Sequence, residues 1–238
     1  MSRLIALLTA CLLALVLASC GGDDGGDETA ATATPTAEAT AEETPAGADE
    51  FLPEGCENVE KPAPKEDGTL EEPKEELDKA KTYVATVSTT CGDFEITLDA
   101  ERAPITGGSF KYLADEKFFD GLTFHRIVAD FVIQGGDPLG AGTGGSGYSV
   151  VEEPPSDLKY TKGIVAMAKT ADEAPGTSGS QFFVVTGAGA EQLPPEYALV
   201  GEVTKGMEVA EKIGSIPAGP DGAPAAAVVI NSVTVSES

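Results

Sequence analysis

The chain has 238 residues, which is enough for one domain of ordinary size with appended segments. Its 40 acidic and 15 basic side chains give a formal net charge of −25. A charge of this sign repels phosphate backbones and anionic lipid headgroups, so we expect no nucleic-acid partner.

The first residues are typical of an export signal. Residues 1–19 contain one basic residue, Arg3, followed by an apolar run that is too short to cross a bilayer, which takes about 20 residues. Residues 17–21, Leu-Ala-Ser-Cys-Gly, resemble a bacterial lipobox, in which the cysteine is lipidated and becomes the new N-terminus. We therefore expect a lipoprotein signal peptide over 1–19 and a lipid anchor at Cys20 on the outer face of a bacterial membrane. Ordinary signal cleavage and an uncleaved anchor are the alternatives.

Two segments of different character follow the signal. Residues 21–50 contain no Leu, Ile, Val, Met, aromatic or basic residue, so they cannot bury enough apolar surface to offset the entropy of ordering. We interpret residues 20–50 as a disordered acidic tether rich in Ala, Thr, Pro and Gly. Apolar side chains return in residues 51–80, which favours a charged arm packed on the domain, with continued disorder as the alternative.

Two cysteines remain in the exported part of the chain, Cys56 and Cys91. An even pair in an oxidising compartment favours one disulfide. Two separate thiols remain the alternative, because the sequence alone does not show that the two Cα atoms come within bonding distance.

The folded region, placed at residues 81–238, begins with alternating apolar residues on both sides of a glycine-containing turn. Residues 83–89 and 94–98 therefore predict a β-hairpin. Pro104 suits the first turn of a helix that runs to about Glu116. Gly107 and Gly108 weaken that helix by about 1 kcal/mol each, so tertiary packing must hold it.

The central stretch, residues 124–137, places one arginine and one glutamine between strand-like apolar runs. Its β-branched and aromatic residues suit a pleated, half-buried surface, so the guanidinium of Arg126 should project from a rigid element.

A glycine-rich run follows at 140–147 and contains a formal G-x-G-x-x-G. Because no helix pattern follows it, we interpret this run as a flexible surface loop and not as a nucleotide site.

The remainder of the chain predicts further short strands, at residues 163–168, 181–186, 197–203 and 228–235, and a second short helix at 207–213 that is stopped by Gly214. Composition and spacing therefore indicate a β-rich sandwich or barrel.

Three segments together resemble one family. F-H-R-I-V from residue 124, F-V-I-Q-G-G-D from 131 and G-S-Q-F-F from 179 closely resemble the diagnostic segments of the cyclophilin family of peptidyl-prolyl cis-trans isomerases. The resemblance covers residues from about 82 to 235. It implies a mainly β fold, a closed eight-stranded antiparallel β-barrel capped by two α-helices, with the site on its outer face.

The same resemblance implies a set of site residues. Arg126 would stabilise the twisted amide, and Gln134 would hold the substrate carbonyl and orient the arginine. The proline ring would sit on five side chains, with two more lining the groove for the preceding residues: Phe131, Val132, Phe183, Leu193 and Tyr197, then Ala168 and Gln181. The larger departures from the family pattern are Gln192, where tryptophan is frequent, and Lys169, where asparagine is frequent. Val132 for methionine and Tyr197 for histidine are smaller ones that keep an apolar wall.

These residues predict an isomerase that needs no cofactor and no metal, because the reaction neither makes nor breaks a bond. His125 is the only histidine, and we interpret it as structural because no G-x-S-x-G elbow accompanies it. The expected partners are proline-containing polypeptides of the cell envelope. We expect the protein to be a monomer held at the membrane by its lipid anchor. The alternatives are a module that binds proline-containing segments without turnover and a passive scaffold.

Overall fold

The structure is a computed structural model that describes residues 50–238. The predicted signal peptide, most of the predicted tether and Cys20 lie outside the described residues. Within residues 50–238, no helix combines the length and the apolar character needed to cross a membrane.

The folded part is mainly β with two α-helices, as predicted. One antiparallel sheet has the strand order β10-β1-β2-β9-β6-β8-β4-β3. Its strands are β1 Tyr83–Thr89, β2 Gly92–Leu98, β3 Arg126–Val128, β4 Val132–Gly135, β6 Ile164–Met167, β8 Phe182–Val185, β9 Leu199–Lys205 and β10 Ile230–Glu237. The other elements are α1 Pro104–Asp115, α2 Met207–Gly214, the 3-10 helix η2 Ala188–Gln192, and the two-stranded pair β5 Val150–Val151 and β7 Thr177–Ser178.

The eight-stranded sheet curls around a core but does not close, so the predicted closed barrel is wrong. Its edge strands β10 and β3 are joined by no ladder; next to them lie an isolated bridge between Thr123 and Val229 and a few backbone hydrogen bonds around it. Residues 216–226 run beside β3 and contain Pro217, Pro220 and Pro224. Proline has no backbone N–H to donate to a ladder, which explains why regular pairing stops here.

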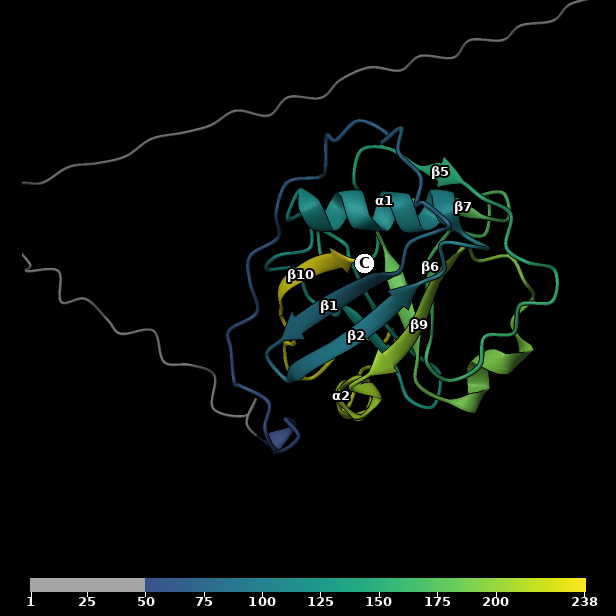
Figure 1. Ribbon diagram of the computed structural model, residues 1–238. Helices are drawn as coiled ribbons and strands as arrows, with labels where there is room; N and C mark the ends of the chain where they lie inside the picture. Colours follow the sequence, from purple (N-terminus) through teal and green to yellow (C-terminus); the bar gives the residue numbers. More distant parts are fainter. Residues whose placement is uncertain (1–49) are drawn as a thin grey trace, which may run out of the picture. The chain divides into compact units, whose positions relative to one another are not determined.

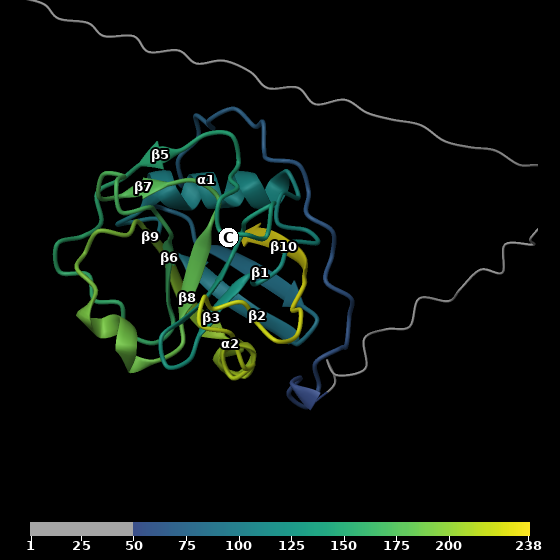
Figure 2. The ribbon, with the colours of Figure 1, turned by 180° about the vertical axis from the view of Figure 1, so that it is seen from behind.

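The two helices cover opposite ends of the curled sheet (Figures 1 and 2). Helix α1 lies against β9 and β10, whereas α2 lies against β2, β3 and β4. Phe110 of α1 contacts Phe182 of β8 with ring centroids 5.5 Å apart in a T-shaped arrangement. This aromatic contact ties α1 to the centre of the core.

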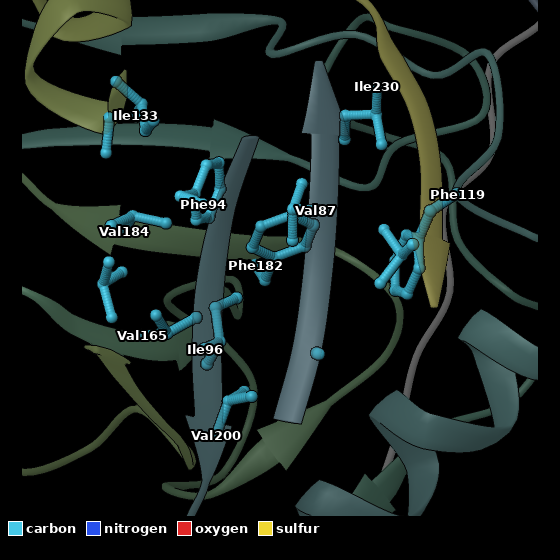
Figure 3. Packing of buried hydrophobic residues seen from close by; sticks show 14 of the residues in the cluster. Val87, Phe94, Ile96, Phe119, Ile133, Val165, Phe182, Val184, Val200 and Ile230 are labelled. Carbon is cyan, nitrogen blue, oxygen red and sulfur yellow. The ribbon is translucent and has the colours of Figure 1, made fainter. Parts of the chain in front are cut away.

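Alternation along the strands separates two packed layers. The inner row across β3, β4, β8 and β6 consists of residues paired in register, Ile127, Ile133, Val184 and Val165. All four are buried in the main hydrophobic core. In Figure 3 the last three follow one another on neighbouring strands beside Phe94 and Phe182. The residues between them point to the opposite face, where a second, smaller cluster forms.

The second cluster is centred on Tyr160, which is fully buried. Its hydroxyl donates a hydrogen bond to the Tyr197 carbonyl oxygen at 2.8 Å and accepts one from the Tyr197 backbone N–H at 2.9 Å. Burial raises the pKa of Tyr160 to about 12, so the phenol remains a neutral donor at physiological pH. Tyr160 therefore fixes the backbone at Tyr197.

Residues 50–80, here called the arm, run along the outside of the domain and over α1 (Figures 1 and 2). A disulfide joins Cys56 to Cys91 in the turn between β1 and β2, with an S–S distance of 2.03 Å. Farther along the arm, Leu77 is buried, and its backbone N–H donates to the Pro104 carbonyl oxygen at 3.0 Å.

The arm also explains the two glycines within α1. A Cβ at Gly107 would lie 2.5 Å from Leu77 Cδ1, and a Cβ at Gly108 would lie 2.5 Å from the Glu75 carbonyl oxygen. Glycine therefore allows the arm to approach the helix closely, and this packing stabilises a helix of low intrinsic propensity.

We predict that replacing both Cys56 and Cys91 with serine lowers the free energy of unfolding by about 3–4 kcal/mol. The reason is that the bond closes a loop between residues separated by 35 positions, which restricts the unfolded chain. Urea unfolding of the double variant against the parent, each with and without reductant, measures the loss. A non-reducing proteolytic digest in which the two cysteine peptides run separately would contradict the bond.

We predict that Tyr160→Phe lowers the free energy of unfolding by about 1–3 kcal/mol, because it leaves the half-buried Tyr197 N–H and carbonyl without their partner. Urea unfolding followed by circular dichroism measures the change. Tyr112→Phe is the matched control, since Tyr112 is a half-buried tyrosine whose hydroxyl makes no hydrogen bond found within residues 50–238. Equal stability of the two variants would show that the Tyr160 bonds contribute nothing.

Candidate active site

The site begins with one row of residues on the outer face of the sheet. Arg126 of β3 pairs in register with Gln134 of β4, Gln134 pairs with Phe183 of β8, and Phe183 pairs with Ala166 of β6. Residues directly opposite each other in antiparallel strands point to the same face. Three short strands therefore place a guanidinium, an amide and an aromatic ring side by side (Figure 2 shows β3 and β8).

This row borders a hollow of about 360 Å³. Apolar side chains form most of its wall, and two charged side chains and one amide complete it: Phe131, Val132, Ala168, Phe183, Leu193 and Tyr197, with Arg126, Lys169 and Gln134. The Phe183 and Tyr197 rings meet in a T-shaped arrangement with centroids 5.5 Å apart. The hollow can therefore accept a small apolar ring with a cationic donor at its rim.

Arg126 is held by a chain of side-chain amides. Its Nη1 donates to Gln134 Oε1 at 3.3 Å, and Gln134 Nε2 donates to Gln181 Oε1 at 2.9 Å. Gln181 Nε2 in turn donates to the Gly144 carbonyl oxygen at 2.9 Å. The amides of Gln134 and Gln181 thus each have a defined orientation, and through them the guanidinium is tied to the backbone.

The structure places the predicted site residues in two adjoining hollows. All of those expected to seat proline line the first hollow with Arg126 and Gln134, whereas Gln181 lines a second hollow of about 580 Å³. Gln134 and Ala168 border both. Gln192, which also departs from the family pattern, is exposed at the end of η2 and does not line the first hollow.

Lys169, one of the departures from the family pattern, makes several contacts at the edge of the site. Its side chain is only 5% exposed, and its Nζ donates to the carbonyl oxygens of Thr170 at 3.2 Å and Glu173 at 3.1 Å. The same atom lies 3.6 Å from Glu196 Oε2 and 5.7 Å from the centroid of the Tyr197 ring. The ammonium therefore joins the loop after β6 to the wall of the first hollow.

The glycine-rich run at 140–147 has no helix or strand, as predicted, but it is more than a surface loop. Gly144 and Ser146 are buried, and the run forms one wall of the second hollow. Sequence reasoning missed its role in holding Gln181, and also missed Asp137, which is only 1% exposed and accepts hydrogen bonds from this run. The signal available was an aspartate directly after two glycines and before a glycine-rich run.

His125 lies beside Arg126 but is buried, and its burial lowers the pKa of the imidazole. A neutral, buried ring behind the strand fits the structural role expected from the sequence. Cys20, the expected lipidation site, lies outside the described residues.

Comparison with known proteins agrees with this geometry. The family model described as "Cyclophilin type peptidyl-prolyl cis-trans isomerase/CLD" matches residues 84–235. Peptidyl-prolyl cis-trans isomerase B of Streptomyces anulatus is 38% identical over 175 residues, which are 66% of this chain and 98% of that protein. Peptidyl-prolyl cis-trans isomerase A of Mycobacterium tuberculosis is 36% identical over 173 residues, 65% of this chain and 93% of that protein.

A solved structure also resembles this fold. A cyclophilin-type peptidyl-prolyl cis-trans isomerase of Cryptosporidium parvum, crystallised in the presence of the dipeptide Ala-Pro, superposes with a TM-score of 0.60 at 29% identity. The match covers 64% of this chain and 98% of that one. Together with the family model, these relatives confirm the resemblance drawn from the three motifs: the chain belongs to the cyclophilin-type peptidyl-prolyl cis-trans isomerases.

Proposed function

We propose that this chain accelerates rotation about X-Pro peptide bonds in exported polypeptides, with Arg126 stabilising the twisted amide electrostatically. The observation that carries the proposal is the position of the Arg126 guanidinium, at the rim of an apolar hollow and hydrogen-bonded to Gln134. Family membership supports the same reaction.

The chemistry explains why these groups suffice. Rotation of an X-Pro bond must overcome a barrier of roughly 18–20 kcal/mol, because amide resonance is lost at the twisted state. In that state the prolyl nitrogen becomes pyramidal and recovers its lone pair. A donor that meets this lone pair stabilises the transition state more than the planar ground state, which is the requirement for catalysis.

Each part of the site then has one task. The aromatic and aliphatic wall, including Phe183 and Tyr197, seats the proline ring. Gln134 holds the carbonyl of the preceding residue and orients Arg126. Because Gln134 already bonds Gln181, its amide does not have to be ordered at the moment of reaction. Arg126 then donates toward the prolyl nitrogen as the amide twists.

The proposal extends to where the protein acts. The lipobox-like residues 17–21 and the Cys56–Cys91 disulfide both support export, because disulfides persist in oxidising compartments. Lipidated Cys20 would hold the domain at the outer face of a bacterial membrane, where its clients are unfolded or partly folded envelope proteins. The domain would act there as a monomer, without a cofactor.

We predict that Arg126→Ala lowers kcat/KM for a short X-Pro peptide by about 10²–10³-fold, the usual cost of removing a preorganised donor from the transition state. The full chain, purified in detergent, would be assayed by exchange NMR or by protease-coupled isomerisation. Arg102→Ala is the matched control, because Arg102 is an exposed arginine paired with Asp99 away from the hollow.

The result separates the enzyme from the binding module. Acceleration by the parent and by Arg102→Ala, abolished in Arg126→Ala, supports the mechanism. An unchanged kcat/KM in Arg126→Ala would refute the role of Arg126 in the mechanism. Peptide binding without acceleration by the parent would instead identify a protein that holds proline-containing segments without turnover.

We predict that Cys20→Ser moves the protein from the membrane fraction to the soluble fraction of an expressing bacterium, because stable anchoring requires acyl chains, each CH₂ of which adds about 0.8 kcal/mol when buried. Fractionation and metabolic labelling with an alkyne fatty acid measure the change. Cys11→Ser, in the apolar run before the cleavage point, serves as the control. Equal labelling of Cys20→Ser and the parent would refute lipidation at Cys20.

A further inference from the structure

The hydrogen-bond chain that holds Arg126 ends on a backbone carbonyl and not on another side chain. From Arg126 it passes through Gln134 and Gln181 to the Gly144 carbonyl oxygen. The position of that oxygen therefore sets the orientation of Gln181 and, through it, of Gln134. Whatever fixes the backbone near Gly144 also fixes the site.

One side of this backbone is held from within the domain. The buried Asp137 carboxylate accepts hydrogen bonds from five backbone N–H groups, those of Leu139, Ala141, Gly142, Thr143 and Gly144. These bonds stop at Gly144. The next two residues of the glycine-rich run, Gly145 and Ser146, are held from the other side.

That other side is residues 65–70 of the arm, here called the strap. Asp67 Oδ1 accepts a hydrogen bond from the Gly145 backbone N–H at 2.8 Å. The Gly68 N–H donates to the Gly145 carbonyl oxygen, and the Leu70 N–H donates to the Ser146 carbonyl oxygen, each at 2.9 Å. The strap thus forms three hydrogen bonds with the two residues that follow Gly144.

The strap and the glycine-rich run also pack so closely that no side chain fits between them. A Cβ at Gly68 would lie 2.5 Å from both the carbon and the oxygen of the Ser146 carbonyl. A Cβ at Gly147 would lie 2.6 Å from the Gly68 carbonyl oxygen. Because both contacts involve backbone atoms, a methyl group at Gly68 must displace one segment from the other.

The strap is itself fixed to the domain before and after these contacts. The Cys56–Cys91 disulfide lies upstream, and the buried side chain of Leu77 lies downstream. The Lys65 N–H also donates to the Pro138 carbonyl oxygen at 2.9 Å, beside Asp137. The strap precedes residue 84, where the match to the family model begins, so this support is an addition to the family domain.

We propose that Asp67 and Gly68 are positioning residues of the active site. They fix the backbone at Gly145, and through the Gly144 carbonyl they orient Gln181, Gln134 and Arg126. This inference rests on the proposed isomerase function, and it assigns a part of that function to a segment outside the family domain.

The first test compares single variants of the full chain in the same isomerisation assay. Gly68→Ala should lower kcat/KM about tenfold, and Asp67→Ala about threefold, the range expected when one or two hydrogen bonds that orient the site are lost. Asp67→Asn should restore most of the activity, because it retains the acceptor oxygen. Glu66→Ala is the matched control, since it removes a charge from an exposed neighbour and should leave kcat/KM unchanged.

The second test asks whether the strap acts through Gln181. In a Gln181→Leu background, Gly68→Ala should cost less than twofold in kcat/KM, because the link between the strap and Arg126 is already cut. Full additivity of the two changes would overturn the proposed route. Unchanged kcat/KM in both Gly68→Ala and Asp67→Ala would overturn the positioning role itself.

A third readout keeps this inference separate from the function on which it rests. The side-chain NH₂ signals of Gln134 and Gln181, followed by NMR, should shift in Asp67→Ala and Gly68→Ala and remain in place in Glu66→Ala. If the parent fails to accelerate isomerisation, the proposed function fails, while these shifts still report whether the strap orients the amides. Unmoved NH₂ signals in a folded Gly68→Ala variant would refute the coupling.

Discussion

The two-residue alternation across β3, β4, β8 and β6 is the constraint on which the site depends. The same four strands bury Ile127, Ile133, Val184 and Val165 in the main core and present Arg126, Gln134, Phe183 and Ala166 on the other face. A shift of one residue in any of these pairings would exchange the two faces. The burial of the inner row therefore also fixes the register that assembles the outer row.

Alternation places Arg126 on the outer face, but it does not by itself orient the guanidinium, because the side chain could still rotate. The two glutamines supply that restriction, because each amide both donates and accepts and so passes orientation along the chain to the Gly144 carbonyl. In the proposed mechanism the reaction costs little ordering entropy, since the groups are already ordered without substrate. The orientation of the Arg126 guanidinium therefore depends on the backbone at Gly144, which is not a neighbour of Arg126 in the sequence.

Local patterns in the sequence predicted much of the fold. The hairpin β1–β2, helix α1 from Pro104 and the short helix α2 follow from alternation, a proline at the first turn and apolar spacing, all of which act between neighbouring residues. The predicted stop at Gly214 was wrong by one residue, because α2 includes Gly214 and ends at the C-cap Ser215. Closure of the sheet was predicted from resemblance and was wrong, because prolines in residues 217–224 interrupt pairing beside β3.

The site shows the same division between local and long-range information. Arg126 and the apolar wall could be predicted, since the motifs that carry them are contiguous. The roles of Asp137, Lys169 and Tyr160 could not, because each depends on partners brought together only by folding, such as the backbone of Tyr197 beside the Tyr160 hydroxyl. The path of the arm was also beyond local reasoning, although the glycines of α1 indicated that something must pack there.

The seam between β10 and β3 leaves two strands at the edges of the open sheet. Unpaired strand edges recruit other extended polypeptides by backbone pairing and so promote aggregation. Here the segments that lead into the two strands bond each other: the Phe124 N–H donates to the Val228 carbonyl oxygen and the Ile230 N–H to the Leu122 carbonyl oxygen. The Ile127 N–H of β3 donates to the Gly222 carbonyl oxygen. An extended polypeptide would thus find these backbone groups already engaged, which leaves less unpaired edge at the seam for it to extend as an added strand.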